Sequence, residues 1–458
     1  MGHPAVLRID AAASWNPDHV PVGRVSVLVD NLSPDRLTIL AHDSPDQVDH
    51  HPAAKHASRL DLSSHVLLPG LINAHTHLDL THLGPHVWDP TRPFSDWVAI
   101  IRAGRLSDAA QIATSVRAGA ALSRAGGTVL VGDIAGAVRG EPSLAAAHAL
   151  ASTGLAGVSF IEFFAIGTRM RENLDLLAAT LAECSGPVNP GTPSPGLHLG
   201  LQPHATNTVA PDAYLHALAL AGQRWARVCT HLAESPEERQ FIRDATGPQR
   251  ALLEQVGVWD EALLATFGLG HHPVEHMAPI LRLARDAGNP MLVAHVNDAT
   301  DNALEILAQT RTSVAYCPRA SAYFGAHHHF GPHRYQAMLH AGINVCLGTD
   351  SVVNITDGTL VPSSGSPARL SILDEMRLLH QRDAADPVTL LRMATTNAAR
   401  ALGLDPTLVT LSPGSTPLEV LGIPIPPAQI GLAAVRTALS QSSAPISILT
   451  RILPVSQQ

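Results

Sequence analysis

One pattern recurs eight times in the middle of this 458-residue chain: an apolar, β-branched run is followed by a stretch with apolar residues at three- and four-residue spacing. Such alternation predicts parallel strands joined by helices, which is an α/β fold. Eight units match a (β/α)8 TIM barrel. A doubly wound sheet is the competing architecture, but no Gly-x-Gly-x-x-Gly sequence follows the first run. The expected strands are residues 71–77, 128–134, 156–164, 197–205, 226–232, 290–296, 312–317 and 343–348, with helices such as 109–125, 212–221, 303–309 and 387–402.

The two ends of the chain have a different character. Residues 24–30 and 36–41 are strand-like runs separated by loops of Pro, Asp, Ser and His. The last 55 residues lose helical periodicity and become rich in Pro and Ser from Leu411 onward. We therefore predict a small β-domain made from residues 1–66 and 404–458, around a barrel of residues 67–403.

Composition excludes several classes of protein. The net charge is −9, with 39 acidic against 30 basic residues and no basic block, so nucleic acid is not an expected partner. No apolar run approaches the ~20 residues of a membrane span, and no signal peptide is expected. The cysteines are widely spaced without a Cys-x-x-Cys pair, which is typical of reduced thiols and predicts a cytoplasmic protein. They are Cys184, Cys229, Cys317 and Cys346.

Polar residues gather at the ends of the predicted strands. His75 and His77 are two apart and point to one face of the first strand. A lone histidine in an apolar strand is more often a hydrogen-bonded core residue, but five of eight strands carry His or Asp at the same end, where barrel active sites lie. The other members of the set are His204, His231, His295 and Asp350. Three imidazoles and a carboxylate, from His75, His77, His231 and Asp350, suit Zn²⁺ or Fe²⁺ and leave room for a water.

Other histidines in the chain are expected to lie in solvated loops. They are His271 and His272, and the segment with His327, His328, His329 and His333. Lysine occurs once, as Lys55, so no lysine is available to bridge two metals from the fourth strand, which offers His204 instead. This predicts one divalent ion, with Zn²⁺ favoured over Fe²⁺.

From Val66 to Gly403 the chain resembles the amidohydrolase superfamily, in its cytosine-deaminase-like branch. The matching segments are LPGLINAHTH (68–77), PHA (203–205), HLAES (231–235), AH (294–295), CPR (317–319), LGTDS (347–351) and ATTNAARALG (394–403). Finer features resemble the aminodeoxyfutalosine and adenosylhomocysteine deaminase-like subgroup. They are PFSDW (93–97), EFF (162–164), the insert from Gly247 to Glu275, and LSILDEMR (370–377).

The resemblance implies that the small domain made from both chain ends is a β-sandwich, and it implies roles for the strand-end residues. His75, His77, His231 and Asp350 would hold the metal, and Asp350 would also take a proton from the bound water. Glu234 would protonate the ring nitrogen and the leaving amine, and His295 would orient the hydroxide. The plain alternative for Glu234 is a surface carboxylate at a helix start. The matching segments also put Arg319 and Ser351 among the substrate contacts.

Three further residues are predicted to contact substrate. Phe94 and Trp97 are three apart, so both rings share one helical face after the first strand. That face either packs on the barrel rim or forms an apolar wall over the substrate. His204 would contact the sugar or the ring edge from below.

The most direct hypothesis is hydrolytic deamination of an adenine-bearing, aminodeoxyfutalosine-like nucleoside by metal-hydroxide attack, with release of ammonia. A chlorohydrolase or cyclic amidase is a second hypothesis, since the same hydroxide can displace chloride or open a ring. A third is a non-catalytic metal-binding scaffold, against which Glu234 and His295 argue because a scaffold does not need them. The expected partner is a small molecule, and a homo-oligomer stays open.

Overall fold

The computed structural model of the chain describes residues 6–18, 23–33, 36–183, 196–224, 226–362 and 367–447. Cys184 and the last eleven residues of the predicted C-terminal segment, 448–458, lie outside these ranges. Cys229, Cys317 and Cys346 are buried free thiols. Among the described residues, no helix is long and apolar enough to cross a membrane.

All eight predicted strands are present and run parallel within two four-stranded sheets, of order β5-β6-β7-β8 and β12-β11-β10-β9. Isolated parallel bridges connect the sheets along both edges, between Thr76 and Asp350 on one side and between Ala205 and His231 on the other. The strands are β5 (Leu71–Thr76), β6 (Thr128–Ala135), β7 (Ala156–Phe163), β8 (Leu197–Pro203), β9 (Cys229–Leu232), β10 (Leu292–His295), β11 (Ser313–Tyr316) and β12 (Val345–Leu347).

Helices follow the strands along the chain. The predicted helix 109–125 has the same limits in the structure, where Asp108 caps its first turn. The helices between and after the strands are α2 (Phe94–Gly104), α3 (Ala109–Ala125), α4 (Ala145–Ala151), α5 (Met170–Ala182), α6 (Pro211–Arg224), α7 (Pro236–Asp244), α8 (Pro248–Gln255), α9 (Pro273–Asp286), α10 (Asp301–Gln309), α11 (Pro318–Tyr323), α12 (Ala326–Phe330), α13 (Tyr335–His340), α14 (Ile372–Asp383), α15 (Pro387–Ala394) and α16 (Thr396–Leu402).

The prediction of one helix over 387–402 is wrong. The segment forms two helices, α15 and α16, because Thr395 leaves helical geometry with φ −137° and ψ −95°. The Thr395 hydroxyl donates to the Leu391 carbonyl, which replaces part of the helical hydrogen bonding at the break.

Two apolar layers hold the strands. One lies among the strands themselves and contains Leu130, Phe160, Cys229, Leu292 and Cys346, all buried. The other packs the opposite strand faces against the helices. Polar side chains at the strand ends therefore sit on a closely packed base.

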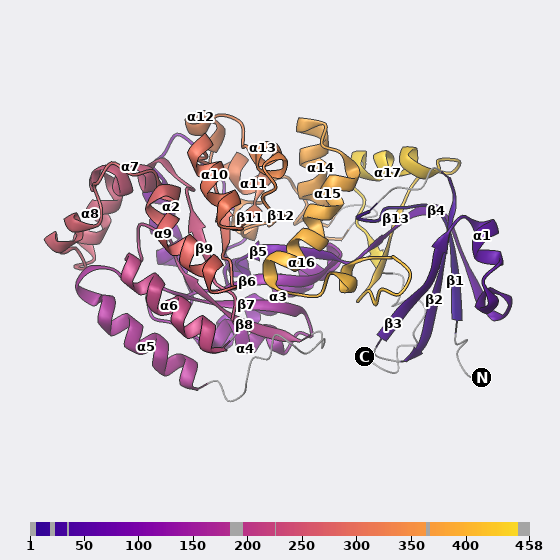
Figure 1. The fold of residues 1–458 in the computed structure, drawn as a ribbon, viewed down its shortest axis with the longest axis horizontal. Helices are drawn as coiled ribbons and strands as arrows, with labels where there is room; N and C mark the ends of the chain where they lie inside the picture. The colour runs from indigo at the N-terminus through magenta and orange to yellow at the C-terminus, as the bar shows by residue number, and fades with distance from the viewer. Residues whose placement is uncertain are drawn as a thin grey trace.

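A six-stranded sheet of order β14-β13-β4-β1-β2-β3 lies at one end of the molecule, opposite α7 and α8. Figure 1 shows its indigo N-terminal strands beside the yellow C-terminal segment. The strands are β1 (Val6–Ser14), β2 (Val25–Ser33), β3 (Arg36–Asp43), β4 (Ser58–Pro69), β13 (Val420–Pro424) and β14 (Ile446–Ser447), with the short helices α1 (Pro45–Asp49) and η1 (Pro52–His56) between β3 and β4.

The sheet draws strands from both chain ends, as predicted, and its arrangement as a sandwich stays a prediction. The long strand β4 pairs with β1 on one edge and with β13 on the other, so the strands form one hydrogen-bonded sheet. The C-terminal segment also contains a helix that the sequence analysis did not predict, α17 (Gly431–Ser440), whose buried face includes Ala434, Val435 and Leu439. The buried Trp15 indole donates to the Pro387 carbonyl over 2.8 Å and ties the sheet to α15.

Candidate active site

The structure brings the predicted strand-end residues together. The His75 ring lies at the centre of an imidazole cluster, with centroid distances of 5.2 Å to His77, 5.0 Å to His231 and 5.3 Å to His295. Two overlapping groups of potential ligand atoms lie within 4.8 Å of one another: His75, His231 and His295 form one, and His75, His77 and Asp350 the other.

Asp350 reaches this cluster from a strained backbone position. It has φ 61°, in the left-handed region that a non-glycine residue rarely adopts. Its N–H donates to the His75 carbonyl over 3.1 Å, and its carbonyl accepts from the His77 N–H over 2.7 Å. Its carboxylate oxygen Oδ1 then lies 3.6 Å from His77 Nε2 and 3.8 Å from His75 Nε2. The backbone bonds to both histidines hold the strained conformation in place.

The imidazoles fit a divalent metal ion. Burial lowers the pKa of His75 and of His77 well below the usual range, so both rings are neutral. Both ring nitrogens of His75, and Nδ1 of His77, are buried without a hydrogen-bond partner in the described chain. His231 Nδ1 lies 2.8 Å from the His204 carbonyl, which favours a proton on Nδ1 and leaves Nε2 free as a ligand. Neutral imidazoles with free nitrogens beside a carboxylate are a Zn²⁺-type donor set.

Glu234 and His295 form a second pair beside these donors. The Glu234 Oε1 atom lies 3.5 Å from His295 Nε2. Burial, and then the charge of Asp350, raises the pKa of Glu234 well above its usual range, which favours the protonated form of its carboxyl. Burial and then Glu375 raise the pKa of Asp350 to about 7. A protonated carboxyl and a carboxyl that titrates near neutrality suit an acid and a base.

Sequence reasoning missed Glu238, which fixes the backbone of Glu234. The buried Glu238 carboxylate accepts from the N–H groups of Ala233 and Glu234 over 2.9 and 2.7 Å. Ala233 has φ 53°, and Asn297 donates to the Glu234 carbonyl over 3.1 Å. The sequence pattern that could have identified Glu238 is its spacing from Ser235 at the start of α7, because Ser-x-x-Glu is the pattern of a capping box.

A buried ion pair was also missed as part of the site. Glu162, at the end of β7, accepts from Arg105 Nη1 over 3.1 Å and from the Ala137 N–H over 3.0 Å. Arg105 also lies 3.4 Å from Asp79, which follows His77. The signal in the sequence was a carboxylate inside an apolar strand, since charges are rarely buried unpaired.

The predicted substrate contacts differ in their surroundings. The His204 ring lies 5.0 Å from the His231 ring and 4.7 Å from the Phe164 ring, and its Nδ1 is 2.8 Å from the Thr208 hydroxyl. This puts His204 directly beside the ligand cluster.

Phe94 and Trp97 lie on one face of α2, as their spacing predicts, and both pack on Phe324 with ring centroids 5.1 and 5.3 Å away. Trp97 is 7% exposed and also packs on Trp88 and Tyr323. These contacts favour the packing role that the sequence left open for this face.

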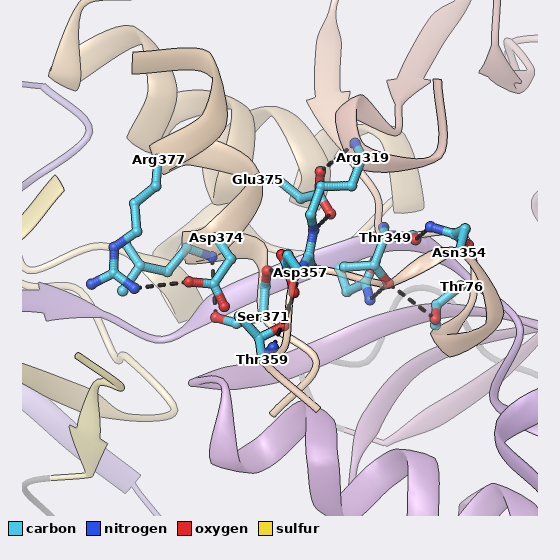
Figure 2. Close-up of polar contacts among 12 residues, drawn as sticks. Thr76, Arg319, Thr349, Asn354, Asp357, Thr359, Ser371, Asp374, Glu375 and Arg377 are labelled. Atoms are coloured by element: carbon cyan, nitrogen blue, oxygen red, sulfur yellow. Dashed lines mark hydrogen bonds and ion pairs between the residues drawn. The ribbon is translucent and has the colours of Figure 1, made fainter. Parts of the chain in front are cut away.

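Arg319, which Figure 2 shows beside Glu375 and Asp357, and Ser351 both have protein partners. The Arg319 guanidinium donates to Glu375 over 2.6 Å and to Asp357 over 3.0 Å. The Ser351 hydroxyl donates to Asn354 and caps the short helix η5 (Val352–Asn354). Their roles as substrate contacts stay predictions.

Two of the histidines expected in solvated loops are placed differently. His333 stacks on Tyr316 at 3.6 Å with Nε2 2.9 Å from the His295 carbonyl, and His272 caps α9 and lies 3.1 Å from Asp298. Both are held by tertiary contacts that the local sequence does not show. His327, His328 and His329 are exposed as predicted, but they form the helix α12 rather than a loop.

The model of the amidohydrolase family matches residues 66–417, well over half of the chain and all of the residues that build this cluster. The chain belongs to the amidohydrolase family. It is accordingly a hydrolase of carbon–nitrogen bonds, and it joins a metal-dependent family.

Relatives and solved structures agree with this membership. The aminodeoxyfutalosine deaminase of Deinococcus radiodurans is 27% identical over 383 residues, covering 80% of this chain and 79% of that enzyme. The 5-methylthioadenosine/S-adenosylhomocysteine deaminase of Symbiobacterium thermophilum is 23% identical over 374 residues, covering 80% and 74%.

Among solved structures, Helicobacter pylori aminofutalosine deaminase matches with a TM-score of 0.71 and 18% identity, over 96% of this chain and 97% of that one. A mutant atrazine chlorohydrolase of Arthrobacter aurescens, complexed with zinc and atraton, matches with a TM-score of 0.67 and 18% identity, over 94% and 91%. These two likenesses concern the fold.

Proposed function

We propose that this family member is a metal-dependent deaminase of an adenine-bearing nucleoside. The observation that carries the proposal is the pair of Glu234 and His295, 3.5 Å apart, beside a cluster of neutral imidazoles and Asp350. The names of the curated relatives, which are deaminases of aminodeoxyfutalosine and of methylthioadenosine or adenosylhomocysteine, support the nucleoside as the substrate class.

His75, His77, His231 and Asp350 would hold one Zn²⁺ ion. The free buried nitrogens of His75 and the zinc in the related chlorohydrolase structure support it. Lys55 is the only lysine of the chain and belongs to η1, so no lysine on the eight strands can bridge a second metal. When bound, such an ion supplies Lewis-acid activation, which lowers the pKa of water from 15.7 toward about 7.

The side chains around the cluster move the protons. Asp350 accepts the proton that the attacking water gives up, while the water oxygen bonds to the ring carbon that bears the amino group. Glu234 gives its proton to the adjacent ring nitrogen, and His295 orients the attacking oxygen through Nε2. Glu234 then passes the hydroxyl proton of the adduct to the amino group, the carbon–nitrogen bond breaks and ammonia leaves, and the proton held by Asp350 returns to Glu234.

The proposal also includes the domain architecture. The bridges between β5 and Asp350, and between β8 and β9, support a closed (β/α)8 barrel over residues 67–403. Residues 1–66 and 404–458 then make up the smaller domain. His204, Trp97, Phe94, Arg319 and Ser351 stay the candidate substrate contacts, and a cytoplasmic location stays a prediction from composition.

Ammonia release tests the function. Zinc-loaded protein is incubated with adenosine, 5′-methylthioadenosine, S-adenosylhomocysteine and aminodeoxyfutalosine, and the inosine-type product is followed by its ultraviolet spectrum. Turnover of at least one compound, with one ammonia per product, is the expected result. Chloride release from a chlorinated triazine without any ammonia release would favour the chlorohydrolase alternative, for which the structural match to such an enzyme is the specific observation.

A further inference from the structure

His333 lies beside the site, in the segment between α12 and α13, and no step of the proposed reaction uses it. Its Nε2 atom is 2.9 Å from the carbonyl oxygen of His295, and its Nδ1 atom accepts from the N–H of Tyr335 over 3.1 Å. A backbone N–H can only donate, so Nδ1 carries a lone pair and the proton of the neutral ring is on Nε2. His333 therefore donates to the His295 carbonyl from one defined tautomer.

The surroundings of the His333 ring favour its neutral form and fix its plane. Burial, against the opposing effect of the bond to His295, lowers the pKa of His333 to about 4. The ring stacks on Tyr316, with centroids 3.6 Å apart and an angle of 12° between the planes. The stack sets the plane of the ring and the Tyr335 N–H sets the position of its proton, so the Nε2–H donor has a fixed direction.

The backbone of His295, which accepts this hydrogen bond, is strained. Its φ is 73°, and the φ of the next residue, Val296, is 50°. The Val296 N–H donates to the Ala294 carbonyl over 3.2 Å, so a γ-turn is centred on His295. Left-handed φ values are uncommon for residues with a side chain and are outliers for a β-branched residue such as valine. Backbone of this kind persists where the surrounding contacts hold it.

The hydrogen bond from His333 is one of those contacts. The pairing of β10 with β11 ends at Ala294 and Ala315, and the next carbonyl, that of His295, accepts from His333. From this turn the His295 side chain places Nε2 3.5 Å from Glu234 Oε1. A change in the turn would therefore move the ring that, in the proposed function, orients the attacking oxygen.

We propose that His333 is a positioning residue for His295, whose strained turn it holds through the hydrogen bond from Nε2. The inference rests on the proposed deaminase function and adds to it a group that acts through His295 without touching the substrate. A displacement of about 1 Å at a reacting group can cost about 10²-fold in rate. Loss of this hydrogen bond should therefore lower kcat while leaving the proposed zinc ligands in place.

Two variants of His333 keep opposite parts of its side chain. His333→Gln keeps an N–H donor at the same number of bonds from the backbone as Nε2, but it loses the aromatic ring. His333→Phe keeps a ring that can stack on Tyr316, but it has no donor. A positioning role predicts that His333→Gln retains kcat within about 3-fold, while His333→Phe loses at least about 10-fold. A packing role predicts the opposite order.

The kinetics use zinc-loaded protein and the nucleoside that wild type deaminates best. KM and zinc content should stay within about 2-fold of wild type in both variants, since the lost contact acts on the transition state. His340→Gln is the control, because it changes an exposed histidine of α13 whose Nδ1 lies 2.7 Å from the Gln336 carbonyl, and it should behave as wild type. A His333→Phe protein with normal kcat, or a His333→Gln protein no faster than His333→Phe, would overturn the inference.

Two measurements do not depend on turnover. Crystal structures of the zinc-loaded variants should show a left-handed His295 in His333→Gln, and in His333→Phe a changed turn with Nε2 displaced from Glu234. Nitrogen NMR of wild type labelled in its histidines should show the His333 proton on Nε2. An unchanged turn in His333→Phe would overturn the inference, and a proton on Nδ1 of wild type would do so even if neither variant folds.

These measurements also separate the inference from the proposed function. If no nucleoside is deaminated by wild type, the deaminase proposal fails. The geometry of the His295 turn and the tautomer of His333 then decide alone whether His333 positions His295.

Discussion

The carboxylate of Glu238 accepts a 2.7 Å hydrogen bond from the backbone N–H of Glu234, four residues earlier in the chain. The same carboxylate accepts from the N–H of Ala233, which has left-handed geometry. The loop that presents the Glu234 side chain to His295 is thus held by a buried carboxylate at the start of α7. Glu238 is a positioning residue in this arrangement.

Replacement of Glu238 by Gln should therefore slow turnover without removing the metal. The amide keeps one acceptor oxygen but loses the charge, so one of two buried N–H groups is left without a partner. Such a loss is worth about 1–3 kcal/mol, and we expect kcat to fall about 10-fold or more with KM nearly unchanged. Steady-state kinetics and metal analysis on the same preparation measure this. A rise in KM alone would mean that Glu238 does not position Glu234.

Replacement of Glu234 by Gln removes the proton donor but keeps the shape of the side chain. The four proposed ligands are untouched, so the zinc content should match wild type. Turnover should fall at least ~10²-fold if the side chain carries protons. Normal turnover in this variant would exclude Glu234 from the mechanism, whatever its distance from His295.

Burial of Asp133 makes the free energy of unfolding of the metal-free protein depend on pH. Asp133 Oδ1 accepts from the Leu78 N–H over 3.0 Å, and burial raises the pKa of Asp133 from 3.8 to about 8. Between these values the folded state binds a proton that the unfolded state has lost, so this group lowers the free energy of unfolding as pH rises from about 4 to 8. Asp133→Asn keeps the acceptor and does not titrate.

The Asp133→Asn variant should accordingly become more stable relative to wild type as pH rises. Urea unfolding of both metal-free proteins at pH 5 and pH 8 should show the difference in unfolding free energy moving toward the variant by more than about 1 kcal/mol. A difference that stays constant between the two pH values would show that Asp133 ionises normally in the folded protein.

Trp97 tests the role of the aromatic face on α2. Its ring packs on Trp88, Tyr323 and Phe324 and is 7% exposed, so Trp97→Ala should cost about 3–5 kcal/mol of unfolding free energy. Trp97→Phe should recover most of that loss. A stable Trp97→Ala protein whose KM for adenosine has risen would instead support a wall over the substrate.

How far the sequence predicts this structure depends on the range of the interactions. The eight parallel strands are visible because runs such as 156–164 are apolar and β-branched throughout. Strand β1 was missed, since VLRIDAAAS is rich in alanine, which has little preference for strands, and forms one only because β2 and β4 pair with both its edges. Helix α17 was likewise hidden in a Pro- and Ser-rich segment.

The candidate site divides in the same way. His75, His77, His231 and Asp350 are each marked by their place at a strand end, which is local information. The partners of Glu234 and Arg105 are not marked by the local sequence, because Glu238 and Glu162 act through contacts that only the folded chain creates. The left-handed backbone of Asp350 is a further example, because the local sequence Gly348-Thr349-Asp350 does not predict it. The hydrogen bonds to His75 and His77 hold Asp350 in this conformation.

Metal stoichiometry tests the centre of the site. The donor atoms form two groups that share His75, which predicts one tightly bound ion per chain and makes His75 the ligand with the largest effect. His75→Ala should lose most of its zinc after dialysis. His204→Ala should keep it, because the His204 carbonyl, which holds His231 Nδ1, belongs to the backbone and survives the substitution. Zinc retained by His75→Ala, zinc lost from His204→Ala, or two tight equivalents in wild type would each require a different set of ligands.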